Sequence, residues 1–179
     1  MISEDAKKGV NHLFTRAARA NLALAPSDTI TIEQLPGTAI VDTPQQRILV
    51  LTVASYVFRL LTIFHVDNDA ATESYFTRSD PERVFGEVFS ELGNLCCGAM
   101  NRDLGKHFLH TGMSTPYLLE SQCLAFLKAL KPAYVVQHRI VINDSVVLHA
   151  TLCLCAYAPI DFRVDSEMAE EATGELELF

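Results

Sequence analysis

Apolar residues between positions 79 and 104 recur at intervals of three and four, the spacing that puts side chains on one side of an α-helix. Ser79 or Asp80 can cap the first free backbone N–H groups of such a helix, and Pro81 suits its first turn because it has no N–H to leave unpaired. We therefore predict one long helix over 79–104. Its buried side comprises Phe85, Val88, Phe89, Leu92, Leu95, Cys96 and Ala99.

Glu87, Glu91, Asn94 and Gly98 recur with the same spacing on the opposite side of this helix, and we call these four residues the polar ridge. Glu91 and Asn94 are about 60° apart around the helix axis, so a carboxylate and an amide lie side by side. A glycine costs a helix interior about 1 kcal/mol relative to alanine, so Gly93 and Gly98 predict a close neighbour at each position. At Gly98 that neighbour could be a partner protein.

Two further patterns predict β-hairpins. Residues 47–55 and 56–66 are apolar runs rich in β-branched and aromatic side chains, and they pair naturally with each other. Residues 134–142 and 146–157 flank Asn143-Asp144-Ser145, three residues that favour a turn. We expect four strands from these two hairpins.

Shorter patterns complete the expected elements. A helix over 3–22 has Ser3 as a possible cap, and alternation predicts a strand over 29–32. Asp67-Asn68-Asp69 closes a strand and can cap a short helix, whereas 114–119 reads as extended and 121–131 as a short helix that Pro132 stops.

Together these elements predict an α/β fold of the α+β type. We expect an antiparallel sheet of about five or six strands, with the helices over 3–22 and 79–104 packed together on one face. The chain has 179 residues, of which 49% are hydrophobic, enough for one well-buried domain. We assign that domain to residues 1–164.

Charge narrows the classes of partner. The net charge of −8 argues against nucleic acid or an anionic membrane surface, because both select for clustered lysine and arginine. Residues 165–179 contain six carboxylates and no lysine or arginine. We expect this segment to be an acidic mobile tail.

The apolar run from Ile48 to Val66 is interrupted by Arg59, and its composition suits buried strands better than a membrane span. No charged-then-apolar signal follows Met1, so we expect a cytoplasmic protein. The five cysteines are an odd number spread through apolar stretches, which is typical of reduced core thiols.

Other kinds of chemical site find little support. Cys153, Cys155, His107, His110 and His149 do not have the spacing of a structural zinc site, so we expect no metal site in this chain. A Cys–His nucleophile is not favoured either, because the only vicinal thiols lie on or beside the apolar side of the long helix. The glycine-rich loops that bind nucleotide phosphates do not occur.

The string Ser90-Glu91-Leu92-Gly93-Asn94-Leu95-x-x-Gly98, followed by Ser114-Thr115-Pro116, resembles the signature helix of the CheC/CheX/FliY family of chemotaxis phosphatases. The resemblance implies a CheC-like fold and a protein aspartyl-phosphate phosphatase whose substrate is a phosphorylated, CheY-like response-regulator receiver domain. Only one Glu-x-x-Asn occurs in a helical context, which favours the one-site CheX type.

The resemblance to the family implies that the catalytic and partner-binding residues are those of the polar ridge. Asn94 would orient the water that attacks the phosphoaspartate, and Glu91 would pair with a lysine of the receiver; Glu87 and Gly98 would contact the partner. The receiver would supply Mg²⁺ from its own acidic pocket, so we expect no cofactor in this chain. The family also implies a homodimer with joined sheets, for which the apolar strand 146–157 would suit as an edge.

Two other functions remain open. The family usually has Asp or Ser where this chain has Glu87, so a non-catalytic adaptor that binds receivers or flagellar-switch-like partners is the alternative. A small-molecule sensor is a third class, which would show itself as a closed apolar pocket beneath the sheet. Nothing in the sequence indicates such a pocket.

Overall fold

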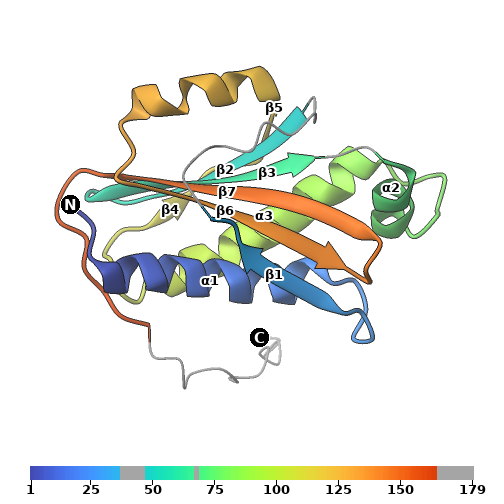
Figure 1. Cartoon of the computed structure of the whole chain (residues 1–179), viewed down its shortest axis with the longest axis horizontal. Coiled ribbons are helices and arrows are strands. Elements are labelled where there is room, and N and C mark those ends of the chain that lie inside the picture. Colours follow the sequence, from blue (N-terminus) through green and yellow to red (C-terminus); the bar gives the residue numbers. More distant parts are fainter. Residues whose placement is uncertain (37–46, 67–68, 165–179) are drawn as a thin grey trace, which may run out of the picture.

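The computed structural model describes residues 1–36, 47–66 and 69–164 of the chain (Figure 1). The expected acidic tail, 165–179, lies outside the described residues, as do Asp67 and Asn68. Within the described part of the chain, none of the helices is long and apolar enough to cross a membrane.

The described residues form one antiparallel sheet of seven strands, so the expected α+β architecture is confirmed. The strand order is β1-β6-β7-β3-β2-β4, and β5 pairs with β2 beside β4. Both predicted hairpins are present, as β2 with β3 and β6 with β7. The bounds of the strands are β1 Ile30–Gln34, β2 Arg47–Ala54, β3 Phe58–Val66, β4 Gly112–Met113, β5 Tyr117–Glu120, β6 Tyr134–Ile142 and β7 Val146–Ala156.

The expectation that strand 146–157 forms an edge is wrong. Strand β7 lies between β3 and β6 and pairs with both along most of its length. Its apolar character has another cause, because one face packs against the helices and the other carries Cys153 and Cys155 in a second apolar cluster. A strand buried on both faces is apolar throughout. The sheet edges are β1 on one side and β4 with β5 on the other.

Helices α1 (Glu4–Leu22) and α3 (Phe85–Leu104) cross the same face of the sheet, as predicted (Figure 1). Helix α1 begins as expected, with the Ser3 hydroxyl accepting the N–H of Ala6 at 3.1 Å. An ion pair between Arg16 and Asp103 joins the two helices. The core between these helices and the sheet includes Phe14, Phe58, Phe64 and Phe89. The expected short helix is α2 (Ala70–Thr77), capped by the Asp69 carboxylate.

Helix α3 begins at Phe85, six residues later than predicted. Arg78 and Ser79 have left-handed backbones, with φ of 54° and 56°, which ends α2 and prevents Ser79 from starting a helix. The Asp80 carboxylate accepts the N–H of Glu82 at 2.9 Å, so it closes a local turn instead of capping α3.

The other face of the sheet is partly covered by the 3₁₀ helix η1 (Ser121–Leu130), drawn in gold at the top of Figure 1. It corresponds to the predicted short helix, and its C-cap is Lys131, directly before Pro132. Its buried residue is Leu127, which packs on Ile48, Val50 and Ile63. The sheet is therefore a middle layer, with α1 and α3 on one side and η1 on the other.

Candidate functional site

The polar ridge lies on the solvent side of α3. Glu87, Glu91 and Asn94 are exposed, and Gly98 is partly exposed. The opposite side of the helix is held by buried residues that face the sheet and α1, namely Phe85, Phe89, Gly93, Cys96, Cys97, Met100 and Leu104. The acid and the amide that the sequence singles out are therefore available to another molecule.

Gly93 explains why α3 presents this side. An added Cβ at Gly93 would lie 2.6 Å from Leu49 Cδ2 and 3.2 Å from Leu51 Cδ1, so the helix backbone packs closely on strand β2. A close neighbour at this position is what the sequence predicts. Because each residue advances about 100° around the axis, a helix that turns Gly93 to the sheet turns Glu91 and Asn94 away from it.

Gly98 has no such neighbour in the described part of the chain. An added Cβ there would lie 3.8 Å from Arg102 Nη1 and 3.8 Å from Met113 Sδ, which is ordinary van der Waals contact. Since nothing described within this chain requires glycine at position 98, its contact with a partner stays a prediction.

One member of the predicted buried side is exposed. Leu95 retains 50% of its accessible surface, whereas Val88, Leu92 and Ala99 pack against the core while staying half-buried. Leu95 is not part of the core cluster between α3, α1 and the sheet. The consequence is an apolar side chain adjacent to Asn94.

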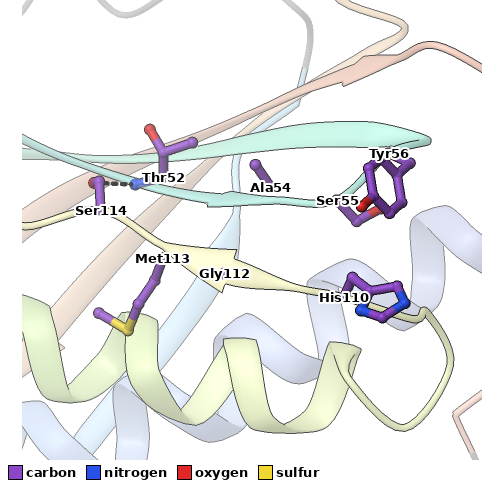
Figure 2. Close-up of a pocket in the computed structure, with 8 residues that line it drawn as sticks. All are labelled: Thr52, Ala54, Ser55, Tyr56, His110, Gly112, Met113 and Ser114. Carbon is purple, nitrogen blue, oxygen red and sulfur yellow. Dashed lines mark hydrogen bonds between the residues drawn. The ribbon is translucent and has the colours of Figure 1, made fainter.

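Strands β4 and β5 bring further apolar side chains to this surface. Met113 is 36% exposed and points towards α3 (Figure 2), and Leu118 is 41% exposed. Leu118 is the cross-strand partner of Leu49, so both lie on the face that carries α3. Leu95, Met113 and Leu118 are exposed apolar residues near the polar ridge, and we call these three residues the apolar frame.

The segment that contains Pro116 is fixed between β4 and β5. The Ser114 hydroxyl accepts the N–H of Thr52 at 3.0 Å (Figure 2). The Ser114 N–H donates to the Thr52 carbonyl at 2.9 Å. These bonds hold the chain against β2, so Met113 is placed by regular pairing and not by a free loop.

A shallow pocket of about 510 Å³ shares Met113 with the apolar frame (Figure 2). Tyr56 and His110 form one end of it, with ring centroids 5.7 Å apart in an edge-to-face arrangement. Its lining contains no carboxylate, and His110 is its one imidazole. Its shape suits a contact surface better than a catalytic pocket.

The charges of the ridge are available to a partner. Within the described residues, neither Glu87 nor Glu91 takes part in an ion pair, and neither does Arg102 one turn beyond Gly98. The Arg102 side chain reaches back over Gly98. The sequence interpretation did not select Arg102, although its spacing of four residues from Gly98 places it on the same side of the helix.

The cysteines do not provide a nucleophile here. Burial raises the pKa of the Cys96 thiol far above its usual range and that of Cys97 to about 11. Both remain protonated near neutral pH, and a protonated thiol is a poor nucleophile. Among the residues that the structure describes, no group of three or more His, Cys, Asp or Glu side chains is arranged to hold a metal ion.

Comparisons of the sequence identify no relatives. No protein-family model matches this chain, and no functionally curated protein matches it.

Comparison of the structure does find similar proteins. The chemotaxis protein CheX from Vibrio vulnificus is 11% identical, with a TM-score of 0.61 over 82% of this chain and 99% of that one. CheX from Borrelia burgdorferi, in a complex with CheY, BeF₃ and Mg²⁺, is 12% identical, with a TM-score of 0.59 over 85% of this chain and 99% of that one. Thermotoga maritima FliY is 10% identical, with a TM-score of 0.51 over 84% and 90%. These likenesses show a shared fold.

Proposed function

We propose that this chain, which has the fold of the CheC/CheX/FliY family, accelerates hydrolysis of the phosphoaspartate on a CheY-like response-regulator receiver domain. The observation that carries the proposal is the joint exposure of Glu91 and Asn94 on one side of a helix that is packed firmly on the sheet. The solved complex of a similarly folded CheX with CheY supports a receiver as the partner.

In the proposed reaction, α3 enters the receiver's active site and Asn94 directs a water molecule at the phosphorus. The amide oxygen accepts a hydrogen bond from the water, and the amide needs no change of protonation to do so. Water adds to phosphorus, the bond to the aspartate oxygen breaks, and that oxygen keeps the electron pair. The water's protons pass to the released phosphate and the solvent. Positioning supplies most of what such a transfer requires.

The neighbouring residues take binding roles in this proposal. Glu91 pairs with a lysine of the receiver, and Glu87 contacts the rim of its active site. Gly98 lets the partner's backbone approach the helix. The apolar frame buries surface on the receiver around this polar centre, which is the usual arrangement at the middle of a protein interface. The receiver brings its own Mg²⁺.

The alternative proposal is an adaptor that binds the receiver through the same surface without turnover. The observation in its favour is Glu87, which places a second carboxylate one turn before Glu91. Two carboxylates near a phosphoryl group increase repulsion in the transition state, so binding could persist while catalysis is lost.

The test is phosphate release from a panel of phosphorylated receiver domains, with binding measured in parallel. We expect wild-type protein to shorten the lifetime of at least one receiver. Asn94→Ala should abolish most of that acceleration, by about 100-fold, while the complex still forms. Glu91→Ala should weaken binding, and Glu73→Ala, an exposed glutamate on α2, is the matched control.

Two results would count against the proposal. Asn94→Ala protein that dephosphorylates its receiver as fast as wild type would refute the assigned role. Receivers that bind the wild-type protein but keep unchanged lifetimes would establish the adaptor instead.

For a homodimer with joined sheets, we propose strand β5 as the contact. Its four residues are all exposed, and it lies at a sheet edge. An exposed strand edge offers unpaired backbone groups to a second copy. Light scattering should give the mass of two chains for wild type and of one chain for Tyr117→Lys; a wild-type monomer at every concentration would contradict this contact.

A further inference from the structure

A cavity of about 170 Å³ lies between η1 and the sheet. Helix η1 lies on the face of the sheet opposite α1 and α3 (Figure 1). Ile48 and Val50 of β2 and Leu61 and Ile63 of β3 line it from the sheet. Residues of η1, including Leu127, line it from the other side. The cavity therefore lies between two layers of the fold, is partly open to solvent, and is separate from the polar ridge.

The lining determines which ligand chemistry the cavity accepts. It contains aliphatic side chains, one phenylalanine and the thiol of Cys123, and it contains no charged side chain. A charged or strongly polar ligand would lose its hydration there without gaining partners. An apolar molecule would make van der Waals contacts with this lining and remove its apolar surface from water.

The size of the cavity sets an upper limit on the ligand. An engineered apolar cavity of about 150 Å³ remains dry and binds benzene or xenon. The cavity described here has a similar volume and an apolar lining, and it differs in being partly open to solvent. It therefore fits a molecule the size of one aromatic ring or a short alkyl chain.

Helix η1, which covers the cavity, is of a kind that could open to admit such a molecule. Helix η1 is a 3₁₀ helix of ten residues, whereas runs beyond three or four residues are uncommon because their hydrogen bonds are poorly aligned. Leu127 is its buried residue, and Phe126 is 72% exposed. Elements with few buried contacts open at a low cost in free energy, so we expect η1 to open more readily than α1 or α3.

We propose that the cavity between η1 and the sheet is a binding site for one small, uncharged, apolar molecule. This site is independent of the receiver surface on α3, and it adds a ligand-binding function to the domain. A small-molecule sensor was expected from the sequence to have a closed apolar pocket; this cavity is apolar but partly open to solvent, so a sensor function stays a prediction.

Benzene is the probe for the first test, added to the full-length protein with labelled Ile, Leu and Val methyl groups. We expect saturable NMR shifts at Ile48, Ile63 and Leu127, and no comparable shifts in the core beneath α1. Shifts spread evenly over both apolar clusters would indicate non-specific partitioning and overturn the proposal. Absence of saturable shifts in the folded protein would overturn it as well.

Cys123 gives a second, independent measurement. It is half-buried at the cavity wall, whereas the other four cysteines are buried. Benzene should slow alkylation of Cys123 by N-ethylmaleimide several-fold at saturation, because the occupied cavity hinders both access to the thiol and movement of η1. An unchanged rate at saturating benzene would contradict a ligand at this wall.

A cavity-filling variant locates the site. Leu127→Phe should remove the methyl shifts and the protection of Cys123, while Leu109→Phe, at an 81% exposed position, should leave both unchanged. If Leu127→Phe fails to fold, Leu124→Phe fills the space from the same helix. A folded filling variant that binds benzene like wild type would place the ligand elsewhere and overturn the proposal.

Discussion

Replacing Gly93 by alanine should weaken the packing of α3 on the sheet, whereas the same change at Gly98 should not. Both positions lie inside the same helix and are separated by little more than one turn. The change in side chain and in helix propensity is therefore the same at both. What differs is the distance from the new Cβ to its neighbours: 2.6 Å to Leu49 Cδ2 at Gly93, and 3.8 Å to the nearest atoms at Gly98.

The expected magnitudes follow from two opposing effects. Alanine stabilises a helix interior by about 1 kcal/mol relative to glycine, so Gly98→Ala should raise the free energy of unfolding by about 0.5–1 kcal/mol. Gly93→Ala has the same gain, but overpacking a core costs about 1–3 kcal/mol. Leu49 and Leu51 are both fully buried and cannot move their side chains into solvent. We expect a net loss of about 1 kcal/mol for Gly93→Ala.

Urea denaturation followed by circular dichroism measures this difference. The two variants should differ by about 2 kcal/mol at an unchanged m-value. Leu49→Val removes one methylene beside Gly93, so it should cost less in the Gly93→Ala background than in wild type. If Gly93→Ala is as stable as Gly98→Ala, the close contact between α3 and β2 is not what orients the ridge.

Three further predictions concern pH and charge. Burial lowers the pKa of His138 to about 4. Between about pH 6.5 and 4 the unfolded state therefore binds a proton at this residue that the folded state does not, so the free energy of unfolding should fall by up to about 3 kcal/mol over this range. Unfolding measurements on His138→Leu should show a smaller loss. For Asp103, burial raises the pKa, but hydrogen bonds and charge from neighbours including Arg16 outweigh it and leave the pKa lowered. Asp103→Asn should therefore cost about 1–2 kcal/mol of unfolding free energy at pH 7, and less as pH falls through the lowered pKa. Arg102→Ala should weaken receiver binding several-fold at low salt and little at high salt, with an unchanged thermal melt as control.

Some features could be predicted from the sequence because they depend on nearby residues. The period of α3 and the alternation in both hairpins are encoded within each segment, and the structure confirms these elements. The same local pattern identifies the polar ridge, because apolar residues on one side of a helix leave the other side to solvent. Asn143 and Asp144 both adopt left-handed backbones in the β6–β7 turn, which is what their residue types favour.

The predictions that differ from the structure concern features that depend on contacts between distant parts of the chain. The apolar sequence of β7 does not reveal whether the strand lies at an edge or in the middle of the sheet. Its pairing with β3 and β6 places it in the middle. Leu95 follows the apolar period of α3, yet the tertiary packing leaves it 50% exposed, so it belongs to the apolar frame. The Asp80 carboxylate, which was expected from the sequence to cap α3, instead bonds to the N–H of Glu82 in a local turn.

The sequence by itself determined the type of most elements and the side of α3 that carries Glu91 and Asn94, because hydrophobic period and turn chemistry act over a few residues. Tertiary structure decided which residues lie next to the polar ridge of α3. Met113 and Leu118 reach it through pairing with β2, and Gly93 turns it outwards by packing on Leu49. The cavity under η1 likewise exists only once strands and cover are assembled, since its walls come from segments far apart in the chain.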